Sequence, residues 1–537
     1  MAKSYDLVIR GGTVVDGTGA PARKADVALR GPAIADVGDL DPAVEAPVLD
    51  VTGLVVAPGF IDAWAAADPL APVFPDAASK LLQGVTTEVA GAGPRYPFPL
   101  AEGATESFDG LGPGFPAPDW TDAKGFMVSV SRATSGINRA FVASYAQIRR
   151  CVIGPSDSRP TRDEARRISL ELDSALAAGC LGLEVDLAEP PGAFASAEQI
   201  VEVGRQLVEA GAVMALSLRD TGGGLESAVE EALEVASRTG VEMVIPSLRI
   251  NPAPYWQKID WLAARLARAR EAGSDLIVTV EPYVAWLGQL ASLLPPLARE
   301  GGPEVAAKRL AGSAAREEVI VALRSRAEGD EGYWTRFSPA LPGGAGPDLT
   351  QRHDSLADIA AARNRPPAEV LIDLLAERPG APVLFFEISE GNVEKMLGWE
   401  FATVGSSSPA RPLDDPRVQP SVHPRDLGTF ARVLRRYLRD KRVFSLEEAV
   451  RRMTSFPADF YGLTGRGRIE PDSAADLVIF DAEKVADRST FGNPSSRPEG
   501  IEHVIVAGRL AVRDGQVTGV RAGQVLRRAL AGGRPAS

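Results

Sequence analysis

Carboxylates, guanidinium groups and serine hydroxyls are the chemically active side chains that stand in or just after the apolar runs of this sequence. Glu88, Glu281 and Arg249 are the most informative of them. Around one cavity they could bind a carboxylate or zwitterionic ligand through charge-assisted hydrogen bonds. They could also supply a general acid and a general base without a metal ion, or serve as plain ion-pair partners.

Side chains that bind metal ions are scarce. The histidines and cysteines of the whole chain are His353, His423, His503, Cys151 and Cys180. No histidine stands at the end of an apolar run, so neither a metal centre nor a Ser-His-Asp triad is indicated. We expect His353 to be a solvated surface residue. For His423 and His503 we expect structural hydrogen bonds that hold a loop or a strand edge.

The composition is typical of a soluble globular protein, with 45% hydrophobic and 24% charged residues in 537. A net charge of −13 disfavours nucleic acid and anionic lipid as partners, because an acidic surface repels both. The sequence shows no signal peptide and no apolar stretch of the roughly 20 residues that a membrane-spanning helix needs. With only two cysteines, we expect a cytoplasmic protein.

Compact apolar runs alternate with helical segments through the middle of the chain, which is the pattern of a parallel sheet wrapped by helices. The candidate strands are Gly59–Ala65, Thr87–Ala92, Phe126–Ser131, Cys180–Leu187, Val213–Leu218, Glu242–Leu248, Leu276–Pro282 and Pro382–Ile388. Eight strands favour a closed (β/α)8 barrel of the TIM type, since that number closes around a filled interior.

The two ends of the chain read as short strands joined by tight turns. We therefore predict a small β-sandwich domain built from residues 1–58 and 465–537, and a barrel domain over residues 59–464. The stretch of about 286–351 breaks the alternation with a Leu/Pro run and a charged helix. We interpret it as an insertion over the barrel mouth.

Active sites of such barrels lie at the carboxyl ends of the strands, whatever the chemistry. On this basis we expect the following residues at the mouth: Trp64, Glu88, Glu184, Asp186, Ser217, Arg219, Ser247, Arg249, Glu281, Tyr283 and Ser407. The serines are small and polar, and their hydroxyls can hydrogen-bond to ordered water, whereas the large side chain of Trp64 fills space.

Several motifs resemble the amidohydrolase superfamily. The frame consists of the run 56–62 (VAPGFID), which enters the first strand, and the run 467–471 (GRIEP), which leads to Ala475-Asp476-Leu477-Val478. Signals such as Leu218-Arg219-Asp220 and His423-Pro424-Arg425 narrow the resemblance to the D-aminoacylase, or N-acyl-D-amino-acid deacylase, type. The resemblance covers nearly the whole chain, and it implies the same barrel, location and insertion.

The sequence departs from that family wherever the family binds its metal. The resemblance implies histidines, a cysteine and a catalytic aspartate at positions that here hold Trp64, Ala66, Gly93, Ser217, Ser247 and Ser407. Losing every ligand leaves nothing to hold the ion or to activate water. We therefore expect no metal and no other cofactor. The family's substrate-contacting tyrosine also corresponds to Glu189 here, while Tyr283 is kept.

From these departures we predict a pseudoenzyme, that is, a D-aminoacylase fold used as a binding, scaffolding or regulatory subunit. One alternative is a metal-independent enzyme that acts on a small polar amide or amino-acid-like substrate. A second alternative is an ordinary N-acyl-D-amino-acid amidohydrolase. As partners we expect a small polar or carboxylate ligand and a homo-oligomer, or a hetero-oligomer with a related subunit.

Overall fold

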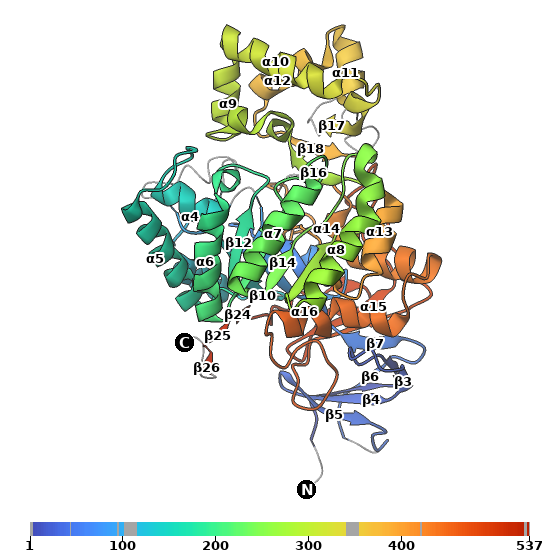
Figure 1. Cartoon of the computed structure of the whole chain (residues 1–537). Helices are drawn as coiled ribbons and strands as arrows, with labels where there is room; N and C mark the ends of the chain where they lie inside the picture. Colours follow the sequence, from blue (N-terminus) through green and yellow to red (C-terminus); the bar gives the residue numbers. More distant parts are fainter. Residues whose placement is uncertain are drawn as a thin grey trace.

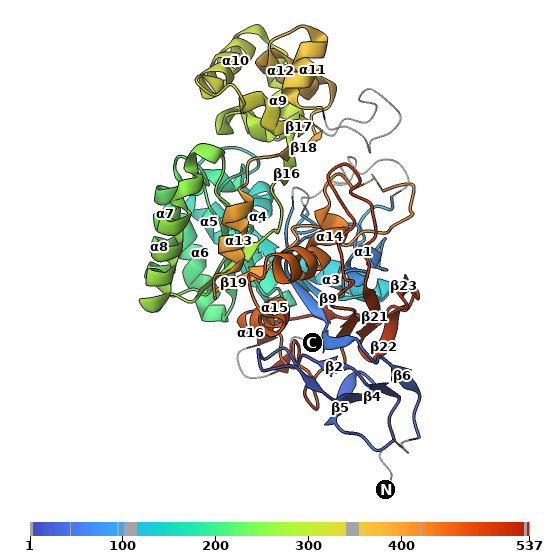
Figure 2. The same ribbon diagram turned by 90° about the vertical axis from the view of Figure 1, so that its right-hand side faces the viewer.

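Three parts make up the molecule in the computed structural model, which describes residues 4–42, 45–93, 96–100, 115–339, 354–418, 421–530 and 534–535. A barrel occupies the centre, a β domain lies at one end, and a mainly helical unit lies at the other (Figure 1). The view turned by 90° shows the helical unit standing clear of the barrel above a short stem of strands (Figure 2). His353 lies outside the described residues.

Eight parallel strand positions form the barrel among the described residues. In order they are β8 (Phe60–Ala66), β9 (Val85–Ala92), β10 (Asn138–Phe141) continued by β11 (Ala143–Ser144), β12 (Gly182–Asp186), β13 (Val213–Ser217), β14 (Met243–Ile245), β15 (Leu276–Val280) and β19 (Ala402–Val404). The barrel closes between its first and last strands, where Ser407 N–H donates to the Trp64 carbonyl at 2.8 Å. The predicted (β/α)8 barrel is confirmed.

Helices cover the outside of the barrel. They are α1 (Ala78–Leu81), α3 (Ala123–Ala133), α4 (Tyr145–Val152), α5 (Arg162–Ala178), α6 (Ala197–Ala210), α7 (Leu225–Thr239), α8 (Ile259–Glu271), α13 (Glu390–Leu397), α14 (Arg425–Arg432), α15 (Leu446–Met453) and α16 (Ser455–Phe460). Reciprocal capping boxes at Thr161 and Ser196 fix the starts of α5 and α6. No helix in the described ranges is long and apolar enough to cross a bilayer.

Two of the eight predicted strands do not belong to the barrel. Residues 126–131 lie inside α3, which Asp122 caps by accepting from Gly125 N–H at 2.7 Å. A short apolar run does not distinguish a buried strand from a buried helix. Residues 382–388 contain β18 of the insertion instead. The two missed barrel strands are β10, which begins with the polar pair Asn138-Arg139, and β19, which has only three residues.

Strands from both chain ends build the β domain, as predicted for the fold. One sheet has the order β5-β4-β1-β6, with β1 (Leu7–Arg10), β4 (Asp26–Arg30), β5 (Ala33–Gly38) and β6 (Val48–Asp50). The other has the order β23-β22-β21-β20-β7-β2-β3, with β2 (Thr13–Val14), β3 (Arg23–Lys24), β7 (Val55–Pro58), β20 (Leu477–Phe480), β21 (Ile501–Val506), β22 (Arg509–Arg513) and β23 (Gln516–Val517). Antiparallel pairing of β7 with β20 joins the two ends.

The last strands leave the β domain. Strand β24 (Val525–Leu526) pairs in parallel with β10 of the barrel, and β25 (Ala529–Leu530) pairs with β26 (Arg534–Pro535). Our assignment of all residues from 465 to 537 to the sandwich is therefore too broad. The short, small and basic tail carries no strand pattern that would indicate its partner.

The inserted unit has a hydrophobic core of its own. Its elements are β16 (Trp286–Gln289), α9 (Pro303–Leu310), α10 (Ser313–Ala327), β17 (Phe337–Pro339), α11 (Leu356–Arg363), α12 (Pro367–Glu377) and β18 (Pro382–Phe385). Strand β18 pairs antiparallel with β16 and β17 to form the stem. The unit thus extends well beyond our predicted range of 286–351. The prediction ended too early because α12 and β18 resemble another helix and strand of the barrel.

His423 fastens the base of this stem to the barrel. The buried imidazole bonds through Nε2 to the Ala285 carbonyl at 3.0 Å and accepts from Arg425 N–H at Nδ1. Burial, reinforced by the Arg425 charge, lowers the pKa of His423 to about 4. The ring is therefore neutral, with its proton on Nε2.

Acidification should weaken the fold through His423. The unfolded imidazole has a pKa of about 6.5, so between pH 6.5 and 4 the unfolded chain binds a proton that the folded chain does not. The neutral His423 imidazole therefore contributes its full stabilisation of the fold above pH 6.5. This stabilisation, about 3 kcal/mol, is lost as the pH falls to 4. Urea unfolding across this window should show a shallower slope for His423→Gln than for the wild type. Equal slopes would contradict the assignment.

Trp64 fills the interior of the barrel near its mouth. The side chain is 2% exposed; its Cβ packs against the closing segment at Gly405, and its ring reaches Gly91 on the neighbouring strand β9. A Cβ at Gly91 would lie 2.5 Å from the ring, and one at Gly405 would lie 2.9 Å from its Cβ. Both glycines are needed to make room for the indole.

Replacing Trp64 by alanine should therefore destabilise the barrel by about 3–5 kcal/mol, because the cavity left behind cannot collapse against closed strands. Denaturant unfolding measures this change. Trp261→Ala is the matched control, since that tryptophan lies half-buried on the surface of α8 and should cost less. A Trp64→Ala variant as stable as the wild type would show that the ring is not a packing element.

Candidate functional site

The carboxyl ends of β14, β15 and β19 bring a set of polar side chains together at the barrel mouth. Ser247 Oγ lies 2.5 Å from Ser407 Oγ. The Ser407 hydroxyl also hydrogen-bonds to the carboxylate of Glu281. Arg425, from the start of α14, donates to the same carboxylate at 2.9 Å. Sequence reasoning placed three of these residues here and missed Arg425, whose only signal was the His-Pro-Arg motif.

Both serines have strained backbones. Ser247 has φ of 49° and Ser407 has φ of 48°, in the left-handed region that non-glycine residues rarely adopt. Such a conformation costs on the order of 1–3 kcal/mol and persists only where the surroundings enforce it. Here the Thr279 hydroxyl accepts from Ser247 N–H at 2.8 Å, and the Trp64 carbonyl accepts from Ser407 N–H. The two hydroxyls are thereby aimed at each other.

Neighbouring cations keep Glu281 ionised in spite of its burial. Burial by itself would raise the pKa of Glu281, but the positive charge of Arg425 lowers it, and the Ser407 hydroxyl and Arg249 lower it further. The pKa of Glu281 is therefore below its usual value. The acid is therefore a carboxylate at neutral pH. It is a hydrogen-bond acceptor and a weak base.

Arg249 forms one wall of the site, where its guanidinium group stacks on two aromatic rings. Its guanidinium carbon lies 4.6 Å from the centre of the Trp286 ring, and Trp286 in turn stacks on Phe385 with centroids 3.9 Å apart. The stack connects a barrel residue to strands β16 and β18 of the inserted unit. Burial lowers the pKa of Arg249, but a guanidinium group keeps its charge in proteins.

Two cavities lie on either side of this stack. The inner one has room for about 10 Å³ and is lined by Ser247, Leu248, Arg249, Glu281, Trp286, Ile388, Val393 and Met396. That volume is close to the minimum for one water molecule. The outer cleft, of about 410 Å³, lies between the barrel loops and the inserted unit and includes Asp220, Asn251, Arg326, Tyr333 and Glu387. Trp286 lines both cavities and separates them.

A pair of acids ends strand β12 at the same mouth. Glu184 and Asp186 are two residues apart on one strand, so their side chains lie on the same face. Burial raises the pKa of Glu184 well above its usual range, and the Asp186 charge raises it further. Burial, followed by Glu189, raises the pKa of Asp186 to about 6. Ser217 stands beside Asp186 in the register of β12 and β13.

Glu88 does not join Glu281 and Arg249, so this part of our prediction is wrong. Its carboxylate pairs with Arg139 at 2.8 Å and lies 3.9 Å from Lys80 Nζ, and it lines neither cavity. The reason is strand alternation: Val89 packs in the barrel interior, and its neighbour Glu88 points to the other side. Burial raises the pKa of Glu88 in spite of both cations.

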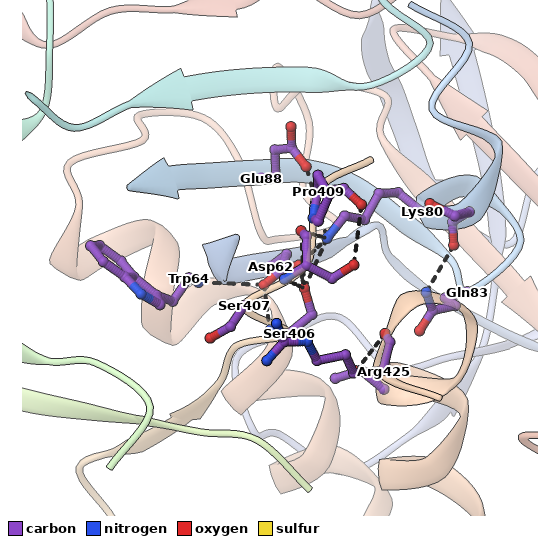
Figure 3. A network of polar contacts seen from close by, with 12 residues as sticks. Asp62, Trp64, Lys80, Gln83, Glu88, Ser406, Ser407, Pro409 and Arg425 are labelled. Carbon is purple, nitrogen blue, oxygen red and sulfur yellow. Dashed lines mark hydrogen bonds and ion pairs between the residues drawn. The ribbon is translucent and has the colours of Figure 1, made fainter. Parts of the chain in front are cut away.

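Lys80 is the cation that sequence reasoning missed. It is buried, and its ammonium donates to Asp62 at 2.5 Å and to Ser406 Oγ and the Ser408 carbonyl at 2.8 Å each. Figure 3 shows this network beside Ser407 and Glu88, with the Trp64 ring directed away from it. A lone lysine in the run Ala78-Ser79-Lys80-Leu81 is ordinarily a solvated residue, which is why the sequence carried no signal.

Arg219 and Tyr283 have structural positions, contrary to our prediction. Arg219 pairs with Glu231 through two bonds of 3.0 and 2.8 Å and donates to the carbonyls of Ala193 and Ala195. It therefore holds the loop after β12 against α7. Tyr283 is buried and donates to the Pro424 carbonyl at 3.2 Å.

The residues present do not fit a metal ion at the mouth. The Trp64 ring occupies the interior beside Gly91, the hydroxyls of Ser247 and Ser407 bond to each other, and the Ser407 hydroxyl also bonds to Glu281. Within the described ranges, no three His, Cys, Asp or Glu side chains are grouped so that they could hold an ion. Neutral hydroxyls and an indole are poor ligands for zinc.

Comparison with known proteins places the chain in a family. A family model described as "Amidohydrolase family" matches residues 414–512. An N-acyl-D-glutamate deacylase and a D-aminoacylase, both from Alcaligenes xylosoxydans xylosoxydans, are 32% and 31% identical over 98% and 99% of each chain. The solved N-acyl-D-glutamate deacylase of Bordetella bronchiseptica, complexed with zinc and a phosphonate inhibitor, is 30% identical, with a TM-score of 0.79. The similarity covers 98% of this chain and 100% of that one.

These relatives correct our functional prediction. They are enzymes that match this chain from end to end, and one solved relative, D-aminoacylase, is described by the role of its binuclear metal centre. Nothing in the comparison supports a scaffolding or regulatory subunit, so the prediction of a pseudoenzyme is wrong. We had inferred loss of catalysis from loss of ligands, although the polar groups that remain at the mouth form an ordered site.

The whole-length identity and the common fold confirm the resemblance of the sequence, and this chain belongs to the D-aminoacylase type of the amidohydrolase superfamily.

Proposed function

We propose that this protein is a metal-independent amidohydrolase that cleaves the amide bond of a small N-acylated amino acid. The observation that carries the proposal is the constellation of Ser247, Ser407 and Glu281 beneath Arg249 at the barrel mouth. It is ordered and polar, and it lies where barrels of this type do their chemistry. The full-length similarity to deacylases supports the reaction class.

The cations at the mouth suit a substrate that carries a carboxylate. Arg249 faces the inner cavity, and Arg425 is held beside it on Glu281. A guanidinium group binds a carboxylate through two parallel hydrogen bonds, which fix orientation as well as charge. The outer cleft of about 410 Å³ falls in the range of small-molecule sites, so it can admit a ligand of this size.

The inner cavity is too small for substrate in the conformation described. Trp286 and Arg249 close it toward the outer cleft. We infer that the ligand enters through the outer cleft and displaces the Trp286 ring, which opens a path to Ser247 and Glu281. Closure behind the substrate would exclude water, so charges would interact more strongly.

The two free thiols, Cys151 and Cys180, agree with a cytoplasmic location. We also propose a symmetric homo-oligomer, since large barrels commonly assemble in this way.

Metal dependence is the first test. Purified protein should turn over members of a panel of N-acetyl-D- and N-acetyl-L-amino acids, with unchanged rates after treatment with a strong chelator. Elemental analysis of the same sample reports any retained metal. Turnover that chelation abolishes and zinc restores would refute metal independence, and an inactive wild type across the panel would refute the amidohydrolase assignment.

Loss of the Arg249 charge should weaken substrate binding. We expect Arg249→Met to raise KM on the order of 10- to 100-fold, because one charge-assisted bond contributes about 1.5–3 kcal/mol. Arg249→Lys should recover part of this loss. Arg265→Met, which removes an exposed ion pair with Glu230 on the barrel surface, is the matched control and should leave KM unchanged. An unaltered KM in Arg249→Met would show that this residue serves only the Trp286 stack.

A further inference from the structure

Two serine hydroxyls at the barrel mouth form a directed chain of hydrogen bonds that ends on a carboxylate. Glu281 is ion-paired with Arg425 at 2.9 Å, so it is a carboxylate whose oxygens can only accept. Ser407, which hydrogen-bonds to Glu281, must therefore give it its single hydroxyl proton. In the contact of 2.5 Å between the two hydroxyls, Ser247 is then the donor. The Ser247 oxygen keeps its lone pairs, and its proton is drawn toward Ser407, because a hydroxyl that donates to a charged group becomes a stronger acceptor.

The backbone presents Ser247 in a way that suits a nucleophile. Ser247 follows the last residue of β14, Ile245, by two positions and has φ of 49°. Strain of this kind in a non-glycine residue is found mainly where function requires a side chain to be held in one direction. The nucleophilic serine of α/β-hydrolases similarly lies in a strained turn directly after a strand, where its oxygen is exposed.

The inner cavity brings Ser247 together with groups that suit an amide. Arg249 lines the same cavity, and its buried Nε atom has no hydrogen-bond partner in the described part of the chain. An unpaired buried donor costs about 1–3 kcal/mol, so its position on a cavity wall indicates an acceptor that a ligand supplies. Four other residues of the wall are apolar, namely Leu248, Ile388, Val393 and Met396. Such a surface suits a short aliphatic acyl group.

We propose that Ser247 is a nucleophile that forms an acyl-enzyme ester, and that Ser407 relays its proton to Glu281. The inference rests on the proposed amidohydrolase function, names the group that attacks the amide and assigns the inner cavity to the acyl part of the substrate. A serine hydroxyl is activated by an adjacent base. Here the base acts through a second hydroxyl, so Ser407 and Glu281 are positioning residues and Ser247 is the catalytic residue.

The reaction balances with water as the only co-reactant. The Ser247 oxygen bonds to the amide carbon as its proton passes to Ser407 and the Ser407 proton passes to Glu281. The positive charges of Arg249 and Arg425 stabilise the negative charge that develops on the carbonyl oxygen. A proton returns along the chain to the amide nitrogen as the carbon–nitrogen bond breaks, which releases the amine and leaves an ester on Ser247. Water then attacks the ester carbon, and its proton follows the same path and returns to Ser247 as the carboxylic acid leaves.

Acetylation by p-nitrophenyl acetate tests the nucleophile without an N-acyl-amino acid. Acid quenching and peptide mass spectrometry should locate an acetyl ester on Ser247 in the wild type. The ester should be absent in Ser247→Gly, in which glycine tolerates the positive φ. Ser131→Ala, which removes an exposed hydroxyl on α3, is the matched control and should be acetylated on Ser247 like the wild type.

Access to the inner cavity is controlled by a second variant in the same assay. Trp286→Ala removes the ring that separates the two cavities, so acetylation of Ser247 should be faster than in the wild type. An ester on Ser407 in place of Ser247 would overturn the proposal. So would the absence of an ester on Ser247 in both the wild type and Trp286→Ala.

The proton relay is tested by its effect on a serine and on a cysteine nucleophile. Ser407→Gly and Glu281→Gln should each slow acetylation of Ser247 on the order of 10²- to 10⁴-fold, which is the usual contribution of general base catalysis. A thiol ionises near pH 8.5 without a base, so at about pH 9 Glu281→Gln should slow Ser247→Cys by less than about tenfold. Equal losses with both nucleophiles would show that Glu281 only supports the fold, and the relay would be refuted.

Turnover separates the nucleophile from the proposed function. On any N-acetyl-amino acid that the wild type hydrolyses, Ser247→Gly should lower kcat on the order of 10³-fold or more. Chelator-resistant turnover that persists in Ser247→Gly would refute the nucleophile and leave the amidohydrolase assignment intact. A wild type that forms the ester on Ser247 but hydrolyses no member of the panel would support the nucleophile and refute that assignment.

Discussion

The buried ammonium of Lys80 is the contact on which the closing segment of the barrel depends. It holds Asp62 of the first strand together with Ser406 and the Ser408 carbonyl of the segment after the last strand (Figure 3). A buried charge is tolerated only where its partners are complete, and removing one partner typically costs about 3–5 kcal/mol. The turn at 406–408 is therefore fixed, and with it the left-handed conformation of Ser407.

This turn connects the barrel framework to the candidate site. The backbone N–H of Ser407 donates to the Trp64 carbonyl, and this hydrogen bond closes the barrel. The Ser407 hydroxyl hydrogen-bonds to Ser247 and Glu281. The same closure leaves Trp64 to fill the interior against Gly91. Packing of one aromatic ring and hydrogen bonding between hydroxyls thus shape the barrel mouth.

Electrostatics gives the acids of the mouth different tendencies to ionise. Glu281 faces Arg425 and Arg249, so it remains a carboxylate that positions cations and the Ser407 hydroxyl. Glu184 has a hydroxyl neighbour and no cation, so burial determines its state. Asp186 lies between these extremes because Arg249 and Arg299 partly offset its burial. Glu88 belongs to the Lys80 network behind the strands and stabilises the framework.

The sequence alone determined the class of fold, the pairing of the two chain ends and the family. These follow from local patterns, namely apolar runs with turn signals and short motifs of fixed spacing, which need no knowledge of distant contacts. It also identified Ser247, Arg249, Glu281 and Ser407, because a barrel places strand ends at one mouth. It misassigned residues 126–131, since a short apolar run has no unique period. It also placed the strand within residues 382–388 in the barrel, because its pairing with the inserted unit is not encoded locally.

Only the tertiary structure decided which polar residues meet. Each barrel strand directs alternate side chains inward and outward, and because Val89 packs inside, Glu88 faces Lys80 rather than Arg249. The partners of Arg219, the burial of Lys80 and the approach of Trp286 from the inserted unit all join residues far apart in the chain. The charge states of Glu184 and Asp186 depend on burial and on Arg249 and Arg299, which no local pattern encodes.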